Sequence, residues 1–266
     1  MGLSKEKQKL IQKLQNSRQR AREGLFLVEG VRGAAEFLEA GARLTIRFAV
    51  VSPRMDELRG GPPLRERLKS LEIHTEMVED QELRALSATE KPQGILLVAE
   101  EPMETLASDT DLSSSRLLLL DGIQDPGNVG TLLRVARGFG LDTVVALDGT
   151  CDPWNPKAVR ASAGAAAHLR VLKAGWEEVW PWVRSQGLPL WVAEANGEDV
   201  RDTDPSARWA LVVGGEGAGV RQEIRSLADG HLAIPLAAGV DSLNVATAGA
   251  ILLYVLSPPP KDQGKP

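Results

Sequence analysis

The sequence is poor in cysteine, histidine and aromatic residues and has no long apolar run, and each scarcity excludes a class of protein. A single cysteine, Cys151, cannot form an internal disulfide. The three histidines, His74, His168 and His231, are scattered along the chain, so we expect no metal site. No apolar run reaches the roughly 18 to 20 residues that a membrane-spanning helix needs. Because the opening MGLSKEKQKLIQKLQ also lacks the uninterrupted apolar core of a secretory signal, we expect a folded, reduced, cytoplasmic protein.

The charge of the chain is unevenly distributed. With 266 residues, 43% of them apolar, the chain has room for one large domain or two modest ones. A net charge of −5 argues, taken alone, against a nucleic-acid partner. Residues 1–22, however, hold seven basic residues and one acidic residue. A basic arm on an acidic body indicates a polyanion bound at one end. A solvated helix face is the alternative that composition leaves open.

Residues 1–101 predict a first domain of alternating helices and strands. Ser4 is placed to cap a helix. The aliphatic side chains of that helix lie along one stripe: Leu3, Leu10, Ile11 and Leu14. We expect strands at residues 25–28, 46–51, 73–78 and 95–99, and helices around residues 31–39, 64–71 and 81–86.

An acidic, serine-rich stretch at residues 102–115 predicts a linker to a second domain at residues 116–257. We expect its strands at residues 117–120, 143–147, 190–193 and 211–213. Each is a continuous aliphatic run, which is typical of central strands in a parallel sheet covered on both faces. The predicted fold class is therefore α/β, with a parallel-sheet C-terminal domain and a smaller N-terminal α/β domain. Residues 258–266, PPPKDQGKP, predict a disordered tail.

Three segments of the second domain depart from a plain α/β pattern, and the first is at residues 125–137. Asn128 is placed to cap a helix that buries Val129, Leu132, Leu133 and Ala136. Arg134 falls on the opposite face. A solvent-exposed helical arginine needs no function, but this helix begins at the carboxyl end of a strand, where α/β sheets usually bind ligands.

The second and third segments lie further along the chain. At residues 214–219 a strand enters four glycines around Glu216, so the chain must turn sharply and expose backbone amides. A carboxylate there would repel a pyrophosphate, which favours a neutral or cationic ligand. At residues 234–254, Ser242 is a plausible N-cap of a helix that is apolar almost all round. Such a helix must be buried in the core or against another subunit, and Asn244 in its first turn needs hydrogen-bond partners.

Taken together, these segments resemble a known family. The ordered motifs are Asn128-x-Gly130-x-x-x-Arg134, Gly214-x-Glu216-x-x-Gly219, and Ile234-Pro235 with Ser242-Leu243-Asn244-Val245. They are similar to those of the SpoU/TrmH family, RNA ribose 2′-O-methyltransferases of the SPOUT class. The resemblance extends to Pro156-Lys157 and to the stretch RASAG at residues 160–164. In the first domain, EGLFLVEG at residues 23–30 and PQGI at residues 92–95 resemble the family's substrate domain, which is like ribosomal protein L30e.

The resemblance implies a parallel sheet with a deep trefoil knot, S-adenosylmethionine as cofactor and a homodimer that completes the active site. It implies cofactor contacts from Gly214, Ile234 and Leu243, with Arg134 as the catalytic arginine. The positioning residues it implies are Asn128, Glu216, Ser242 and Asn244. The family arginine that Arg134 matches is often proposed to accept the proton of the ribose 2′-hydroxyl. Free arginine is effectively always protonated, so the alternative role is to hold the adjacent phosphate. We expect RNA contacts from Lys5, Lys9, Lys13, Arg18, Arg20 and Arg22.

The predicted function is methyl transfer from S-adenosylmethionine to a ribose 2′-hydroxyl of structured RNA. Ribosomal RNA is favoured over transfer RNA, because relatives with an L30e-like extension often act on it. Transfer RNA stays an alternative substrate. Two other functions remain: a non-catalytic RNA-binding scaffold of the same fold, and a nucleotide-dependent oxidoreductase built on the glycine-rich turn. The complete motif set argues against the scaffold.

Overall fold

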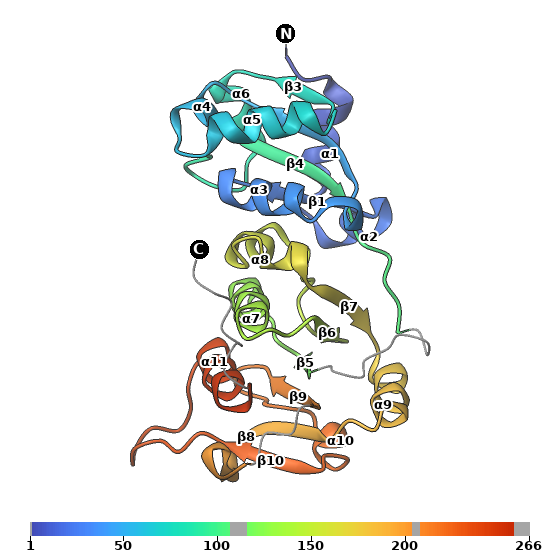
Figure 1. The fold of residues 1–266 in the computed structure, drawn as a ribbon, viewed down its shortest axis with the longest axis vertical. Coiled ribbons are helices and arrows are strands. Elements are labelled where there is room, and N and C mark those ends of the chain that lie inside the picture. The colour runs from blue at the N-terminus through green and yellow to red at the C-terminus, as the bar shows by residue number, and fades with distance from the viewer. Residues whose placement is uncertain (1, 107–115, 204–207, 258–266) are drawn as a thin grey trace. The chain divides into compact units, whose positions relative to one another are not determined.

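The computed structural model describes residues 2–106, 116–203 and 208–257. The chain forms two compact units (Figure 1), one of residues 1–103 with 152–168 and one of residues 104–151 with 169–266. Most of the expected linker, at residues 107–115, and the expected tail lie outside the described residues. The domain bounds stay a prediction. Residues 152–168 group with the first unit although they connect two strands of the second.

The first unit contains a four-stranded sheet in the order β1-β4-β2-β3. Its strands are β1 (Leu25–Glu29), β2 (Ile46–Val51), β3 (Thr75–Met77) and β4 (Ile95–Glu100). Strand β4 runs antiparallel to both β1 and β2, whereas β3 runs parallel to β2. Its helices are α1 (Lys5–Lys13), α2 (Ser17–Glu23), α3 (Val31–Glu39), α4 (Arg54–Glu57), α5 (Gly61–Ser70), α6 (Asp80–Leu86) and α8 (Pro156–Ala161), with short 3₁₀ turns at Gly41–Arg43 and Ala165–His168.

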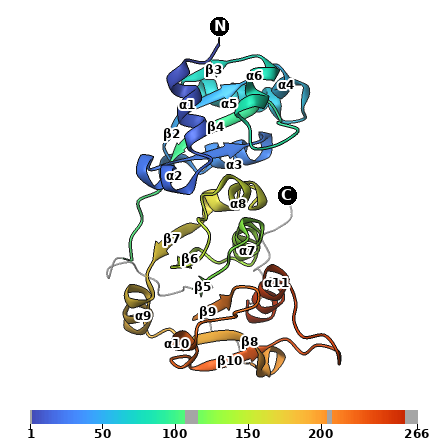
Figure 2. The same cartoon turned by 180° about the vertical axis from the view of Figure 1, so that it is seen from behind.

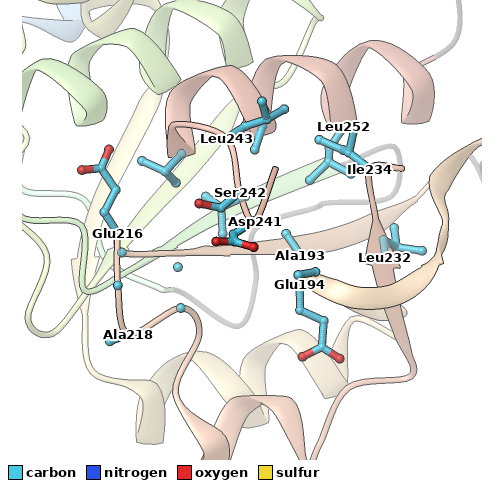
Figure 3. A pocket seen from close by; sticks show the side chains of 18 of the residues that line it. Ala193, Glu194, Glu216, Ala218, Leu232, Ile234, Asp241, Ser242, Leu243 and Leu252 are labelled. Carbon is cyan, nitrogen blue, oxygen red and sulfur yellow. The ribbon is translucent and has the colours of Figure 1, made fainter. Parts of the chain in front are cut away.

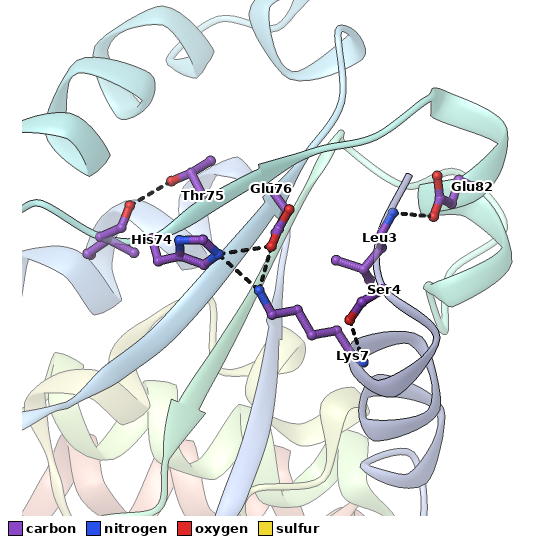
Figure 4. Close-up of polar contacts among 8 residues, drawn as sticks. Leu3, Ser4, Lys7, His74, Thr75, Glu76 and Glu82 are labelled. Carbon is purple, nitrogen blue, oxygen red and sulfur yellow. Dashed lines mark hydrogen bonds and ion pairs between the residues drawn. The ribbon is translucent and has the colours of Figure 1, made fainter. Parts of the chain in front are cut away.

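The basic amino-terminal segment forms two packed helices rather than an extended arm. The Ser4 hydroxyl accepts a hydrogen bond from the Lys7 backbone amide, which confirms the predicted cap of α1. Ile11 and Leu14 are fully buried in a cluster that also contains Phe48 of β2. Figure 4 shows the polar contacts at the edge of this packing. The Lys7 ammonium lies within hydrogen-bond distance of His74, just before β3, and donates a hydrogen bond to Glu76 on β3. Burial of one helix face therefore orders the segment.

The second unit is built on a six-stranded sheet in the order β10-β8-β9-β5-β6-β7, and every neighbouring pair is parallel, as predicted. Its strands are β5 (Arg116–Asp121), β6 (Thr143–Leu147), β7 (Arg170–Ala174), β8 (Leu190–Asp199), β9 (Trp209–Gly214) and β10 (Gly230–Ala233). Its helices are α7 (Pro126–Gly138), α9 (Trp176–Ser185), α10 (Gln222–Arg225) and α11 (Val245–Leu256), with a 3₁₀ turn at Val200–Asp202. Figures 1 and 2 show α7 and α11 together on one face and α9 on the other.

Strands β7 and β10 were not predicted from the sequence. Both lie at the outer edges of the sheet, where one side of a strand has no neighbour and polar residues are tolerated. The aliphatic run of β7 is interrupted by the exposed Lys173, and β10 begins with Gly230 and His231. Among the helices in the described part of the chain, none combines the length and apolarity that crossing a membrane requires.

Candidate active site

Three loops meet at one end of the parallel sheet. They follow β5, β9 and β10; the second and third motifs lie in or directly after two of them, and the first begins in the opening turn of α7, which follows the loop after β5. Because the carboxyl ends of parallel strands lie at the same edge of a sheet, residues more than a hundred positions apart are brought together there.

The three motifs are joined at one carboxylate oxygen. Asn128 Nδ2 donates a hydrogen bond to Glu216 Oε1 at 2.9 Å, and Asn244 Nδ2 donates to the same oxygen at 2.7 Å. Asn244 Nδ2 also lies 3.1 Å from Asn128 Oδ1. Hydrogen bonds to a charged acceptor are stronger than neutral ones, so this network fixes the three loops relative to one another.

Two helix caps differ from the prediction. The N-cap of α7 is Asp125, whose side chain accepts from the Asn128 backbone amide at 3.0 Å; Asn128 itself lies inside the first turn. The N-cap of α11 is Asn244 instead of Ser242, with Oδ1 accepting from Ala246 N at 3.0 Å and Thr247 N at 3.3 Å. In both helices the residue that caps is the one whose oxygen reaches the free amides of the first turn. The amide of Asn128 is thereby left available for Glu216.

The turn after β9 depends on glycine because its backbone packs against itself and its neighbours. A Cβ atom on Gly214 would lie 2.1 Å from the Gly219 carbonyl carbon, and one on Gly215 would lie 2.4 Å from the Gly122 oxygen. Neither contact is sterically allowed. The buried Asp121 holds the end of the turn, since its carboxylate accepts from Arg221 N at 2.8 Å and Arg221 Nε at 2.7 Å. The sequence analysis missed Asp121, although a lone acid ending an aliphatic strand is a usable signal.

A cavity of about 440 Å³ opens beside this turn (Figure 3). Its volume falls within the range typical of small-molecule sites. All three predicted cofactor residues, Gly214, Ile234 and Leu243, line it, together with Ser242 and Glu216. Apolar side chains and the glycine-rich backbone form much of the rest of the lining.

The charged residues that line the cavity are all acids: Glu194, Glu216 and Asp241. The sequence analysis did not single out Glu194, a residue of β8 that bonds His231 Nδ1 at 2.7 Å and Arg225 Nη2 at 2.5 Å. An acidic, partly apolar lining favours a ligand that carries positive charge.

Arg134 is exposed on α7 and is not among the residues that line the cavity of a single chain. The helix places it two turns beyond Asn128, in agreement with the prediction that it faces away from the buried side of α7.

The basic residues expected to contact RNA divide into two groups. Exposed positions on or near α1 and α2 hold Lys5, Lys9, Lys13, Arg18 and Arg22. Arg20, by contrast, is fully buried and ion-paired with Asp152 at 2.7 Å, and it also donates to the Leu14 carbonyl at 3.0 Å. The expectation for Arg20 is corrected on this ground, since a buried guanidinium held by a carboxylate anchors the helix instead of presenting charge to a partner.

Comparison with known proteins finds two matching families. The SpoU rRNA Methylase family matches residues 115–254, and the MRM3-like substrate binding domain matches residues 5–97. The chain is 34% identical to the 23S rRNA (guanosine(2553)-2′-O)-methyltransferase RlmP of Bacillus subtilis, over 92% of this chain and 93% of that protein. It is 30% identical to the 23S rRNA (guanosine-2′-O-)-methyltransferase RlmB of Coxiella burnetii, over 85% and 93% of the two chains.

Solved structures resemble this fold along nearly its full length. The SpoU methyltransferase AviRb from Streptomyces viridochromogenes, in complex with the cofactor AdoMet, has a TM-score of 0.80 at 27% identity, covering 94% of this chain and 96% of that one. An AdoMet-bound rRNA methyltransferase from Sinorhizobium meliloti has a TM-score of 0.84 at 25% identity, covering 96% and 95%.

Proposed function

Because the chain belongs to the SpoU rRNA Methylase family, we propose that it transfers a methyl group from S-adenosylmethionine to a ribose 2′-hydroxyl of ribosomal RNA. The observation that carries the proposal is the network of Asn128, Glu216 and Asn244 beside the acidic cavity. Ribosomal RNA is favoured over transfer RNA, because full-length relatives such as RlmP and RlmB are named for methylating 23S rRNA.

The cavity fits S-adenosylmethionine in volume, in the apolar surface of its lining and in charge. The cofactor carries a purine ring, a sulfonium, an ammonium and a carboxylate, so its net charge at neutral pH is positive. Ile234 and Leu243 offer apolar surface for the purine, and the turn at Gly214 exposes backbone groups without side-chain obstruction. Glu194 is already paired with Arg225. The negative charge that attracts the cofactor's positive groups therefore comes from Glu216 and Asp241. Bound there, S-adenosylmethionine supplies an electrophilic methyl group.

The residues of this chain contribute alignment more than proton transfer. The ribose oxygen forms a bond to the methyl carbon as the carbon–sulfur bond breaks, and the sulfur keeps the electron pair, so the reaction needs an in-line approach. Asn128, Glu216 and Asn244 hold the loops that fix this approach. Arg134 holds the phosphate beside the reacting ribose through its guanidinium, while the hydroxyl proton leaves to solvent. Ser242 holds the substrate at the mouth of the cavity.

We propose that the working enzyme is a cytoplasmic homodimer. Leu236 and Val240 beside the cavity, and Tyr254 on α11, are large apolar side chains that are 38%, 49% and 71% exposed. Large exposed apolar side chains are candidates for an interface, and in this proposal a second copy covers them and completes the site to which Arg134 contributes. The exposed basic residues of α1 and α2 contact RNA in this proposal. The trefoil knot implied by the resemblance stays a prediction.

The test is methyl transfer from tritiated S-adenosylmethionine to purified ribosomal RNA, with transfer RNA in parallel. Alkali cleaves RNA only where the 2′-hydroxyl is free, so ribose methylation leaves the label in an alkali-resistant dinucleotide. We expect such a dinucleotide from ribosomal RNA. Cofactor binding without incorporation into either RNA would instead identify a non-catalytic scaffold.

A further inference from the structure

A second cavity, of about 200 Å³, lies within the first unit. Three separate segments line it: the end of β1 with the start of α3, the residues just before β4, and the end of α8. These segments include the stretches EGLFLVEG, PQGI and RASAG of the sequence analysis. None of them has a part in the proposed methyl transfer, so the cavity calls for a separate explanation.

Each of the three segments contributes one basic side chain to the cavity: Arg32, Lys91 and Arg160. Within the part of the chain that the structure describes, these three exposed side chains make no ion pair or hydrogen bond. The one acid in the lining, Glu29, is engaged, because its two oxygens accept from Ser87 Oγ and Ala88 N at 2.8 Å each. The charged side chains of the lining are therefore three cations and one carboxylate, and that carboxylate is held by neutral donors rather than by any of the three cations.

The backbone around the cavity is held tightly. Gln93 Oε1 accepts from the Val31 amide at 2.9 Å and lies 2.9 Å from where a Cβ of Gly30 would be. On the α8 side, a Cβ on Gly164 would lie 2.4 Å from Glu36 Cγ, so that turn packs directly against α3. The three cations are thus presented from fixed segments, which reduces the entropic cost of binding a ligand.

We propose that the cavity rimmed by Arg32, Lys91 and Arg160 binds backbone phosphates of the RNA substrate. The identity of the polyanion as ribosomal RNA rests on the proposed function. Guanidinium groups bind phosphate oxygens in pairs, and an ammonium acts as a compact point charge. None of the residues that line the cavity is aromatic, so it offers no stacking surface for a base. Contacts of this kind position an RNA without reading its sequence.

The test measures equilibrium binding of the full-length protein to an rRNA fragment that the wild type binds, over a range of salt concentrations. The variants are Arg32→Ala, Lys91→Ala, Arg160→Ala and the triple substitution. We expect each single variant to lower the slope of log affinity against log salt by about 0.7 to 0.9, and affinity at 0.1 M salt by roughly five- to tenfold. Affinity for S-adenosylmethionine and the melting temperature should not change, because none of the three lines the first cavity.

The matched control is Arg67→Ala. Arg67 is an exposed arginine of α5 in the same unit, and it does not line the cavity. Its substitution should leave both slope and affinity unchanged. An equal loss in Arg67→Ala would show a general effect of net charge and overturn the proposal, as would wild-type binding by the triple variant.

A second measurement uses the unmodified protein and so does not depend on folding of the variants. Acylation of lysines, read by mass spectrometry, should be at least severalfold slower at Lys91 when the rRNA fragment is bound. Lys69, which pairs with Glu66 on α5, serves as the reference. Equal protection of the two lysines would contradict the proposal. A protein that binds the fragment and protects Lys91 but transfers no methyl group would disprove only the proposed activity.

Discussion

Asn244 Nδ2 donates a hydrogen bond to Glu216 Oε1 at 2.7 Å, while the side-chain oxygen of the same residue, Oδ1, caps helix α11. One side chain thus couples the start of a buried helix to the glycine-rich turn after β9. Because Asn128 donates to the same Glu216 oxygen, the start of α7 is held by the same contact. The spacing of these three loops should therefore be sensitive to a small change at position 244.

Two substitutions separate the roles of Asn244. Serine is also a good N-cap, so Asn244→Ser should keep the free energy of unfolding near that of the wild type, whereas Asn244→Ala should lower it by about 1 kcal/mol. Alanine has no donor, and serine has a single polar atom where Asn244 uses one atom to cap α11 and another to donate to Glu216, so both variants should lose most methyl transfer. Urea denaturation and the tritium assay measure the two effects. Wild-type turnover by Asn244→Ser would mean that the hydrogen bond to Glu216 does not position the site.

Arg134→Ala should abolish methyl transfer without affecting stability or cofactor affinity. The side chain is exposed and does not line the cavity, and substitutions at such positions usually change stability by less than about 0.5 kcal/mol. Arg137→Ala, at an exposed position of the same helix, is the matched control and should retain activity. Calorimetry with S-adenosylmethionine and thermal unfolding complete the comparison. If Arg134→Ala turns over normally, Arg134 has no part in the reaction.

Gly214→Ala should displace the turn that lines the cofactor cavity. The added Cβ would lie 2.1 Å from the Gly219 carbonyl carbon, so the backbone must move by more than 1 Å. Displacements of that size can cost about a hundredfold in turnover, and cofactor affinity should fall with it. Gly138→Ala is the control, since a Cβ there would meet nothing within 4 Å. Equal cofactor affinity in the two variants would show that the turn does not shape the cavity.

The first two motifs follow strands that the sequence predicts, and their convergence follows from a general property of parallel sheets; the third follows β10, which the sequence did not predict. The caps were harder to predict. Asp125 and Asn128 both suit an N-cap, as do Ser242 and Asn244, and only the folded backbone shows which oxygen reaches the free amides.

Long-range partners were also beyond the sequence. Arginine is usually found at the surface of a protein. The burial of Arg20 depends on Asp152, which lies 132 positions further along the chain. Asp121 likewise gains its role from Arg221, 100 positions away. Local patterns carry no information on such pairs, so a basic cluster read from sequence overstates the charge available to a partner.

The contact between α1 and β3 should depend on pH through Glu76. Hydrogen bonds from Lys7, and then from His74, hold the pKa of the Glu76 carboxyl below its ordinary value (Figure 4). A carboxyl with a lowered pKa in the folded state stabilises that state above its unfolded pKa of about 4.3, and this stabilisation is lost as the pH falls through the lower folded value.

A double-mutant cycle of Lys7→Met and Glu76→Gln isolates this interaction, because the contact of Lys7 with the Phe48 ring cancels in the cycle. The coupling free energy should be about 0.2 to 1 kcal/mol at neutral pH, the range for partly exposed pairs. It should fall towards zero in acid, once Glu76 is protonated in the folded protein. Urea denaturation of the four proteins between neutral pH and pH 3 measures it. A coupling that is equally large at both ends of that range would show that Glu76 does not hold α1 through its charge.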